Sequence, residues 1–449
     1  MIPELYNSAT RKIEPLPQKQ TFNIYSCGPT VYDFAHIGNL RTFLFEDLLI
    51  RSLKFLGYSV NHVRNITDVD DKIIERGYQK KLECQKITDL FSKHFFEDLE
   101  TLNFDQSSTT YLKATNYIPQ TIVLIQQLIN RGVAYDSEDG VYFQTKAFPK
   151  YGDFPGLDLK HIKTGASGSE EFLDKQNLDD FVLWKKHKPE DGEIFWESPW
   201  GKGRPGWHTE CAAIATNTFP EGLDIHTGGI DLLFPHHTNE KAQYECLSNN
   251  TMAKIWLHTT HLLVDNKKMS KSSGTFYTLK DLLSKGFSAR AVRFYLLTGA
   301  HYRTPLNFTL EGLAAAEQSL KRLDNFIHEF SAKDAPDPQL KIRFTTALMK
   351  DFNISAAMSE IFELVNDFFQ RKNFPVQTIS DLKEINNILG FLRFDNSETL
   401  TPEEKLLFDM RIEARDTKNW IESDRLRDEL LNLGIEVRDS KEGTSWRRL

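Results

Sequence analysis

The segment from Thr21 to Ile66 alternates between two hydrophobic periods, and this alternation constrains the fold more than any other feature of the sequence. Apolar and polar residues alternate over Thr21–Ser26, as in a half-buried strand. From Asn39, apolar residues recur every three or four positions until Gly57, which predicts a helix that ends at this glycine. Tyr58–Ile66 again has the character of a strand. Strand, helix and strand in succession form the unit of a parallel sheet, so an α/β fold is predicted.

This unit points to two loops as candidate ligand-binding segments. In parallel sheets, ligands bind beyond the carboxyl ends of the strands. Here those ends lead into residues 27–39 and 67–72. We therefore expect functional side chains of the first domain in these two loops.

Shifts in composition along the chain predict several domains, because 449 residues are too many for one compact hydrophobic core. Residues 103–202 are richer in turns and aromatic residues, and after 307 the pattern becomes long-helical, with breaks near 331–339 and 395–402. The expected domains are a Rossmann-type parallel-sheet catalytic domain in two halves, 1–102 and 203–306, a connective insertion, 103–202, a helical bundle, 307–395, and a small C-terminal domain, 396–449. The last of these is predicted as helix, helix, short strand and tail.

The composition excludes some classes of protein. No run of about 18 uncharged apolar residues is present, so no membrane-spanning helix is predicted, and residues 1–19 lack the apolar core of a signal peptide. Four scattered cysteines are too few for a disulfide scaffold and favour a reducing, cytoplasmic location. The net charge of -8 is opposite to that of a non-specific nucleic-acid binder, so an RNA partner would need local basic patches.

A short polar motif, His36-Ile37-Gly38-Asn39, separates the first strand from its helix. Backbone N–H groups and the helix dipole favour phosphate at such a position. Gly38 allows a nucleotide to approach closely, and the His36 imidazole can donate a hydrogen bond to a phosphate oxygen on which charge develops. Taken alone, the motif is more typical of an ordinary helix start with a solvated histidine.

A second motif, Lys268-Met269-Ser270-Lys271-Ser272, is followed by Ser273-Gly274 and has no apolar period. Two lysines on a glycine-ended loop can close over a triphosphate and stabilise the leaving pyrophosphate. A charged surface turn is the alternative for any one lysine pair. The two motifs in this order, roughly one Rossmann domain apart, are much less expected by chance than either alone.

With these motifs the chain resembles the class I aminoacyl-tRNA synthetases, whose signatures are HIGH and KMSKS, and within them the cysteinyl-tRNA synthetases. The resemblance covers nearly the whole chain. It is carried by Cys27-Gly28-Pro29-Thr30-Val31-Tyr32-Asp33, Arg64-Asn65-Ile66-Thr67-Asp68-Val69-Asp70-Asp71-Lys72, Pro205-Gly206-Trp207-His208, Glu210-Cys211, Asp224-Ile225-His226, Phe234-Pro235-His236-His237, Asn239-Glu240 and Gly443-Thr444-Ser445-Trp446-Arg447-Arg448. Two departures are Asn39, where the general signature ends in histidine, and Thr238. Asparagine can donate a hydrogen bond but carries no positive charge, so the electrostatic role is assigned to His36.

Four residues from distant segments have side chains that zinc accepts as ligands. His236 and Glu240 are four apart after Pro235, a favourable first helical residue, and so share one face of a helix. Cys27 ends a strand, and Cys211 lies in another break. Spacing alone leaves the site open, because single cysteines are often only buried and a His/Glu pair is usually a surface contact. The resemblance implies that the two cysteines, His236 and Glu240 together bind one zinc ion.

The metal gives a physical account of substrate choice. Serine differs from cysteine by one atom, and shape alone separates such near-isosteres by only about 1 to 3 kcal/mol. Zinc binds a thiolate strongly and a hydroxyl poorly, so it distinguishes sulfur from oxygen directly. The resemblance places Thr67, Trp207 and Asp231 around the amino acid, and the substrate-binding set also includes Cys27 and Gly28.

Two other patterns are interpreted as unrelated to ligand binding. The run Gly201-Lys202-Gly203-Arg204-Pro205-Gly206 matches a dinucleotide-binding pattern, but a proline interrupts it and no apolar strand precedes it. Asp68, Asp70 and Asp71 resemble a magnesium cluster, yet three acids at a strand end are more typical of a helix cap and a solvated loop.

Further histidines occur near the proposed ligands. His226 and the segment from His258 to His261 carry ring nitrogens of a kind that zinc accepts. They are interpreted as polar or substrate-side groups and not as zinc ligands.

The C-terminal segment from residue 401 combines flat aromatic side chains with basic ones. Trp420 and Trp446 offer surfaces on which unpaired bases can stack, and Arg447 and Arg448 can contact phosphate. From composition alone, a salt-bridged helical bundle would be the more ordinary interpretation. The resemblance implies an anticodon-binding domain that contacts tRNA through these four residues.

The resemblance implies a ligase that activates L-cysteine with ATP, accompanied by Mg²⁺, and transfers it to the terminal ribose of tRNA(Cys). His36, Lys268 and Lys271 would stabilise the phosphate charge. A cytoplasmic monomer without membrane contact is expected. One rival is a cysteine ligase with a small amine acceptor, which would not need the C-terminal tryptophans and arginines. Another is a non-catalytic zinc-containing RNA-binding protein, against which His36 and the two lysines speak.

Overall fold

The computed structural model describes residues 2–154, 180–248, 250–269, 274–330, 339–370, 378–394, 400–440 and 443–448. The chain forms two compact units. Met1–Leu323 with Lys333–Leu392 make up the first, and Asp324–Ala332 with Arg393–Leu449 make up the second. Most of the helical segment predicted over 307–395 thus belongs to the same unit as the residues before it.

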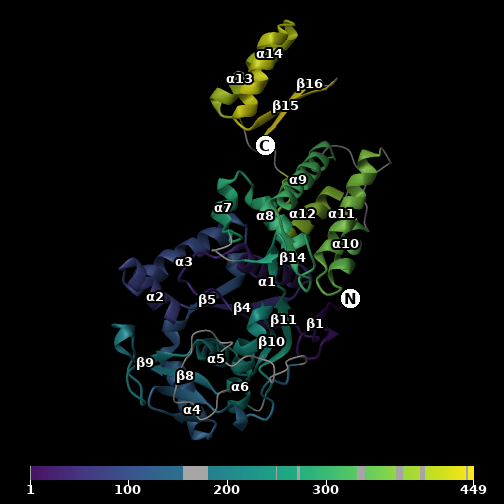
Figure 1. Ribbon diagram of the computed structural model, residues 1–449. Coiled ribbons are helices and arrows are strands. Elements are labelled where there is room, and N and C mark those ends of the chain that lie inside the picture. Colours follow the sequence, from purple (N-terminus) through teal and green to yellow (C-terminus); the bar gives the residue numbers. More distant parts are fainter. Residues whose placement is uncertain are drawn as a thin grey trace. The chain divides into compact units, whose positions relative to one another are not determined.

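A five-stranded parallel sheet lies at the centre of the first unit (Figure 1). In the order β11-β10-β3-β4-β5, its strands are Ala253–Thr259, Leu223–Gly229, Thr21–Ser26, Ser59–Ile66 and Thr109–Lys113. The two strands predicted first are confirmed, the second with a start one residue later than expected. From β3 the sheet grows through β4 and β5 on one side and through β10 and β11 on the other. The carboxyl ends of β3 and β10 therefore meet at a topological switch point, where α/β sheets bind ligands.

Helix α1 (Ile37–Phe55) connects β3 to β4 and buries most of its side chains. It begins two residues before the predicted start because His36 caps it. His36 Nδ1 accepts a hydrogen bond from the Asn39 N–H, and Asn39 Oδ1 accepts one from the His36 N–H. Gly57 then adopts a φ of +88°, which a residue without a side chain adopts readily. The helix N-terminus thus lies at the ligand-binding edge of the sheet.

A four-stranded antiparallel sheet lies in the inserted region. Its strands are β6 (Ala134–Asp136), β7 (Gly140–Phe143), β8 (Phe181–Lys186) and β9 (Gly203–Pro205), and helix α4 (Ile118–Asn130) precedes them. Strand β5 belongs to the parallel sheet although it falls within 103–202, and β9 closes the antiparallel sheet just beyond residue 202. The glycine-rich run at 201–206 therefore contributes a strand to this sheet.

The other elements before residue 392 are mainly helices. They are β1 (Glu4–Asn7), β2 (Lys12–Pro15), α2 (Asp71–Lys80), α3 (Cys84–Thr101), α5 (Trp207–Thr218), α6 (Thr238–Leu247), α7 (Leu279–Ser284), α8 (Ala289–Thr298), α9 (Leu310–Phe330), α10 (Leu340–Leu348), α11 (Ile354–Phe369) and α12 (Thr378–Leu389). A small sheet in the order β13-β12-β14 has the strands Lys267–Lys268, Leu262–Val264 and Leu306–Phe308. The helical pattern predicted after residue 307 is confirmed.

The second unit contains α13 (Pro402–Asp416), α14 (Trp420–Asn432) and a hairpin of β15 (Ile435–Ser440) and β16 (Gly443–Arg448). The predicted helices and first strand are confirmed, but the predicted tail is wrong. It forms a second strand, because its backbone pairs antiparallel with β15 along its whole length. A small core lies between helices and hairpin, with members Phe408, Leu430, Ile435 and Val437.

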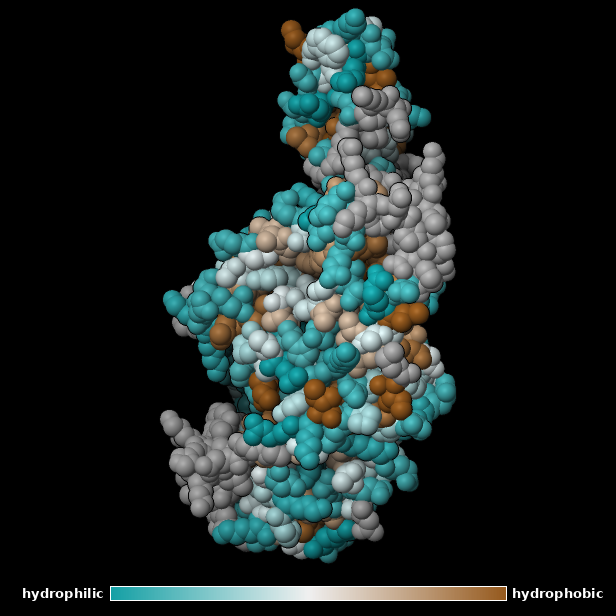
Figure 2. All heavy atoms as spheres, turned by 90° about the vertical axis from the view of Figure 1, so that its right-hand side faces the viewer, coloured by the Kyte–Doolittle hydropathy of each residue, from teal (hydrophilic) through white to brown (hydrophobic). Residues whose placement is uncertain are grey.

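The surface and the helices carry no long apolar stretch within the described residues (Figure 2). On the face drawn in Figure 2, hydrophobic residues form small separate groups among hydrophilic ones. Within the described ranges, no helix combines the length and the apolar composition that crossing a membrane requires.

Candidate functional site

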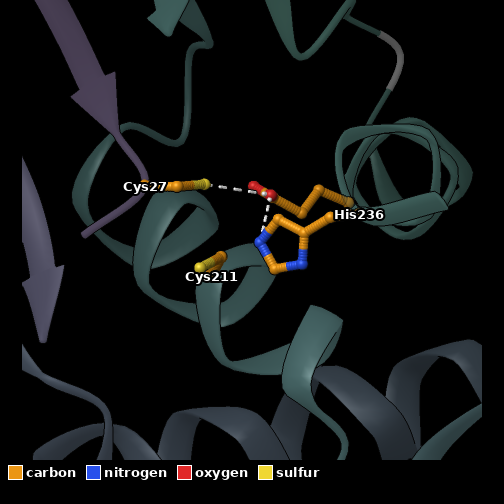
Figure 3. Close-up of side chains that lie close together, drawn as sticks. Cys27, Cys211 and His236 are labelled. Carbon is orange, nitrogen blue, oxygen red and sulfur yellow. Dashed lines mark hydrogen bonds and ion pairs between the residues drawn. The ribbon is translucent and has the colours of Figure 1, made fainter. Parts of the chain in front are cut away.

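Four buried side chains converge at the switch point between β3 and β10. Cys27 follows β3, Cys211 lies in α5, and His236 and Glu240 lie just before and within α6. One ligand-type atom of each lies within 4.8 Å of those of the other three. Figure 3 shows Cys27, Cys211 and His236 directed toward one another from three separate segments. We call these four residues the ligand cluster; they are the residues that the sequence proposed as metal ligands.

The placement of His236 and Glu240 depends on the turn before α6. The chain is kinked within Leu233–His237, the segment that leads into α6. Phe234 has an extended backbone, so the continuous helical segment starts at Pro235, where a proline is favourable. Both side chains therefore share one face, and His236 Nε2 lies 3.0 Å from Glu240 Oε1.

Burial and proximity set the protonation of the ligand cluster. Burial raises the pKa of the Cys27 thiol well above its usual value. Burial acts in the same direction on Cys211, but the neighbouring Cys27 and His236 lower its pKa to about 6. Burial would lower the pKa of His236, yet Glu240 and Cys211 raise it to about 10. His236 thus carries a proton beside two anionic groups, and a cation ligated there would take the place of that proton.

The two ring nitrogens of His236 have different surroundings. Its Nδ1 lies 2.8 Å from His208 Nδ1, and the Trp207 ring lies against it with centroids 4.3 Å apart. Its Nε2 is buried and, although close to Glu240, makes no well-aligned hydrogen bond. An imidazole that is oriented through one nitrogen and lacks an aligned partner on the other has the arrangement of a metal-bound histidine.

A second set of ligand-type atoms shares two members with the first. Cys27 and Glu240 also lie within 4.8 Å of His226 and His237. His226 Nε2 is 2.9 Å from Glu240 Oε2, and His237 Nε2 is 3.4 Å from Cys27 Sγ. The ligand cluster is the stronger candidate because it includes both thiols, which soft divalent metals prefer, and leaves the two histidines as outer partners. His226 is therefore much closer to the candidate metal position than its interpretation as a polar or substrate-side residue suggested.

Sequence reasoning missed a line of polar groups behind Cys27. His237 Nδ1 lies 2.9 Å from His258 Nε2, and His258 Nδ1 lies 2.8 Å from the Ser8 hydroxyl. Burial lowers the pKa of His258 to about 3 and that of His237 well below its usual value, so both are neutral. The only local signal was the His236-His237 pair itself, because His258 and Ser8 are brought in by other strands.

His36 and Asn39 face each other at the N-terminus of α1. Their mutual hydrogen bonds give Asn39 a structural use at the position where the general signature has histidine. The Ile37 N–H donates to the Tyr277 carbonyl oxygen at 2.9 Å, and the His36 ring meets the Phe276 ring edge-on, with centroids 5.5 Å apart. The His36 motif and the segment after the lysine motif are therefore neighbours.

The lysine motif begins in a hairpin of β12 and β13. A two-residue turn at 265–266 with positive φ angles joins the strands, and Lys268 is exposed on β13. Met269 follows, and a Cβ atom added to Gly38 would lie 2.5 Å from Met269 Cε. Gly38 thus permits close packing between the two motifs. Lys271 lies outside the described residues.

The other predicted substrate residues lie at the ends of strands or helices. The Gly28 N–H donates to Asn65 Oδ1 at 2.8 Å, and a Cβ at Gly28 would overlap the Asn65 carbonyl oxygen at 1.7 Å. Thr67 follows β4, is buried, and its hydroxyl accepts a hydrogen bond from Asn65 at 2.9 Å. Asp231 follows β10 and is exposed, and Trp207 begins α5. Each therefore lies close in the chain to the switch-point edge or to the ligand cluster.

The three acids after β4 point to different partners and share no site. Asp70 caps α2 as predicted. The expected solvated loop is wrong for Asp71, which is the first residue of α2 and pairs with Lys185 at 2.6 Å and with Arg204. The Asp68 carboxylate accepts hydrogen bonds from the backbone N–H and the hydroxyl of Thr115. Because β8 and β9 supply the basic partners of Asp71, this one acid connects the antiparallel sheet to the start of α2.

The proposed tRNA contacts of the second unit differ in exposure. Trp420, the first residue of α14, is 55% exposed. Trp446 in β16 is partly buried and packs against the small core of this unit. The backbones of Arg447 and Arg448 form the end of β16. Trp420 is therefore accessible although the Arg415 guanidinium lies over its ring, 5.8 Å from the centroid, whereas Trp446 also stabilises the fold.

Two family models match the chain. One describes the tRNA synthetases class I (C) catalytic domain and matches residues 12–318, and the other describes the cysteinyl-tRNA ligase anticodon binding domain and matches residues 397–447. Cysteine–tRNA ligases of Chlamydia trachomatis serovar A and Chlamydia muridarum are 47% and 46% identical, each over 99% of both chains. The corresponding protein of Protochlamydia amoebophila is 44% identical over 99% of this chain and 97% of its own.

Solved structures show the same fold at low identity. Mycobacterium tuberculosis methionyl-tRNA synthetase in complex with methionyl-adenylate has a TM-score of 0.60 at 12% identity, over 83% of this chain and 88% of that one. A putative arginyl-tRNA synthetase from Campylobacter jejuni has a TM-score of 0.53 at 14% identity, over 83% and 91%. At such identities the likeness concerns the fold alone.

Proposed function

The chain belongs to the cysteinyl-tRNA synthetases, a family of class I aminoacyl-tRNA synthetases, and from this premise we propose how its site selects and activates cysteine. The enzyme joins L-cysteine to tRNA in two steps. The cysteine carboxylate attacks the α-phosphorus of ATP, which gives cysteinyl-adenylate and pyrophosphate. The 3′-terminal ribose of tRNA(Cys) then accepts the cysteinyl group. Matches over both the catalytic and the anticodon-binding segments carry this assignment.

A zinc ion in the ligand cluster would select the substrate. Two thiolates, an imidazole and a carboxylate form a donor set that zinc accepts, and the buried His236 Nε2 without an aligned hydrogen bond fits a ligating nitrogen. Zinc held there supplies a soft acceptor for a substrate thiolate, which a serine hydroxyl does not match. His208 would orient the His236 ring through its Nδ1.

The residues around the cluster would hold the rest of the amino acid. The exposed Asp231 carboxylate at the end of β10 suits the cysteine ammonium group. Trp207 would cover the substrate on the side where it already contacts His236. Gly28 and Thr67, both bonded to Asn65, would form a rigid wall at the ends of β3 and β4.

The phosphate groups of ATP, with Mg²⁺, would bind at the N-terminus of α1. Gly38 and Asn39 lie in the first turn of the helix, Asn39 is exposed, and His36 would donate to phosphate oxygens. Lys268 would approach from β13, whose next residue packs on Gly38. Lys271, from the same motif, would stabilise the leaving pyrophosphate.

The second unit would recognise tRNA in the cytoplasm, with the enzyme acting as a monomer. Trp420 and Trp446 would stack on unpaired bases, and Arg447 and Arg448 would contact phosphate. The match to an anticodon-binding domain over residues 397–447 speaks against a ligase with a small amine acceptor.

The test is ATP/pyrophosphate exchange with a panel of amino acids, followed by charging of tRNA. Cysteine should support exchange, and the efficiency of exchange should be at least about 100-fold lower with serine. Such a ratio exceeds the discrimination that shape alone provides in most cases. Exchange with cysteine but no transfer to any tRNA would favour the small-acceptor ligase. Equal exchange with serine would remove the proposed role of zinc.

A further inference from the structure

Arg41 is a buried arginine on α1, five positions after His36, and only 2% of it is exposed. Its Nη1 donates to the carbonyl oxygens of Thr260 at 2.8 Å and His261 at 3.2 Å. Its Nη2 donates to those of His301 at 3.1 Å and Thr304 at 2.8 Å. One guanidinium thus binds four main-chain carbonyls, two from each of two loops.

Both loops lead into the small sheet that carries the lysine motif. Thr260 and His261 immediately precede β12, which pairs with β14 in parallel and with β13 antiparallel, so that Leu263 lies opposite Lys268. The loop with His301 and Thr304 leads into β14. Arg41 therefore binds the starting points of two of the three strands in this sheet.

The same sheet is tied to α1 on the far side of the lysine motif. The Ile37 N–H donates to the Tyr277 carbonyl oxygen, and the Thr275 hydroxyl donates to the Lys268 carbonyl oxygen at 3.3 Å. Arg41 and Ile37 thus fasten the segments before and after the motif to one rigid helix. Arg41 does so through side-chain hydrogen bonds, and the Phe45 ring of α1 adds a stacked contact with Tyr302 in the second loop, with centroids 4.1 Å apart.

We propose that Arg41 is a positioning residue that holds Lys268 at the correct distance from His36, so that both reach the same nucleotide. This inference rests on the phosphate roles proposed above for His36 and Lys268. A planar guanidinium with donors in a fixed fork can satisfy four carbonyls in two directions, whereas a lysine ammonium acts as a single point. Arg41→Lys should therefore keep the positive charge but loosen the sheet from the helix.

Arg293 provides a matched control within the same unit. It is fully buried and also has four acceptors, the carbonyl oxygens of Leu389, Leu102 and Asn103 and the carboxylate of Asp47. Its acceptors lie at the ends of α12 and α3 and on α1, and none lies in the loops that precede β12 or β14. Arg293→Lys should cost stability as Arg41→Lys does, without changing the position of Lys268.

The experiment uses the full chain and follows single-turnover formation of cysteinyl-adenylate. Arg41→Lys and Arg41→Gln should slow this step by about 30- to 100-fold, as expected for a misplaced catalytic group, with the KM for cysteine changed less than about twofold. Each variant is assayed the same number of degrees below its own unfolding temperature. Under these conditions the rate of the Arg293→Lys enzyme should stay within about threefold of that of the unsubstituted enzyme.

A double-mutant cycle with Lys268→Ala gives the decisive readout. If Arg41 acts through Lys268, Arg41→Lys should slow the Lys268→Ala enzyme by less than about threefold. If the double variant is instead slowed by the product of the two single-variant factors, the inference is overturned while the role of Lys268 stays intact. A Lys268→Ala enzyme with normal rate would instead disprove the phosphate role of this lysine, and the inference with it.

Discussion

The two units of this synthetase present their functional groups in opposite ways. In the first unit, Cys211, His236 and Glu240 are at most 1% exposed, whereas in the second unit the Trp420 ring is 55% exposed. A small substrate must be enclosed if one atom is to decide between cysteine and serine, because discrimination requires that competing water be excluded. A folded RNA cannot be enclosed, so its bases must find rings that are already accessible.

This contrast suggests that amino-acid selection and tRNA recognition are physically separable. The ligand cluster, His36 and Lys268 all belong to the first unit, and the C-terminal tryptophans belong to the second. Loss of groups from the second unit should therefore leave cysteine activation intact.

The largest effect is expected from removal of the second unit's C-terminal part. A chain that ends at Asp395 should retain ATP/pyrophosphate exchange with cysteine, because every proposed catalytic residue remains. Its tRNA charging efficiency should fall by about 1,000-fold, since several base-stacking contacts worth roughly 1 to 3 kcal/mol each are lost. Both activities are measured on one preparation whose fold is checked by circular dichroism.

A full-length variant controls for damage to the fold by truncation. Trp420→Ala removes one exposed ring and should weaken charging alone, by roughly 10-fold. Loss of exchange in the shortened chain would mean that the second unit also supports the catalytic fold. Unchanged charging would show that the anticodon role is wrong.

The next effect concerns the enclosed site. Cys211→Ser should lower the zinc content from about one ion per chain and weaken cysteine binding by about 100-fold, while ATP binding is largely kept, because a hydroxyl replaces a thiolate ligand. Zinc is measured by plasma mass spectrometry and binding by calorimetry. Cys246→Ser, at a partly buried thiol outside the ligand cluster, is the control and should change neither quantity.

The elements that could be predicted from the sequence are those whose signal is local. The alternation over Thr21–Ser26 and the helical period after Asn39 depend only on neighbouring residues, and both elements were found. Strand β16 was missed because its residues are mostly polar and it exists only through pairing with β15. Strand β5 was assigned to the insertion for a similar reason, since it is a short edge strand with a partly exposed sequence.

The ligand cluster could not have been derived from spacing. Its members Cys27 and Glu240 are 213 positions apart, and their proximity is produced by the order of strands in the sheet. The family resemblance supplied the set, and the structure brought the four side chains together. The surrounding histidines, such as His208 and His258, carried no pattern of their own because each is placed by a different element.

An effect of similar size, this time on rate, is expected from the lysine motif. Lys271→Ala should slow adenylate formation by about 100-fold with little change in cysteine affinity, as expected when a group acts on transition-state charge. Rapid-quench measurements of adenylate formation separate the two quantities. Lys267→Ala, in the exposed strand before the motif, is the matched control. If affinity falls while the rate constant holds, Lys271 binds the ground state and the assignment is wrong.

The smallest effect is expected at a buried charge of the second unit, and it concerns the stability of that unit. Arg411 is only 1% exposed and binds both carboxylate oxygens of Asp439, at 3.0 and 2.7 Å. Hydrogen bonds from Arg411 lower the pKa of Asp439 to about 2, with Thr444 and Arg415 acting in the same direction against burial. Because the folded-state pKa is below the unfolded value of about 4, the stabilisation is complete above pH 4 and is lost as the pH falls through 2.

Asp439→Asn should therefore destabilise the second unit by about 1 kcal/mol at pH 7, a modest value because solvent screens the partly exposed carboxylate. Hydrogen exchange of the β15–β16 amides in the full-length chain measures this difference, which should stay constant down to about pH 4 and shrink below it. Asp424→Asn is the control, since Asp424 is 68% exposed and lies 3.9 Å from its partner Arg427. Equal effects of the two substitutions would mean that the second unit gains no stability from the pairing of Asp439 with its buried arginine.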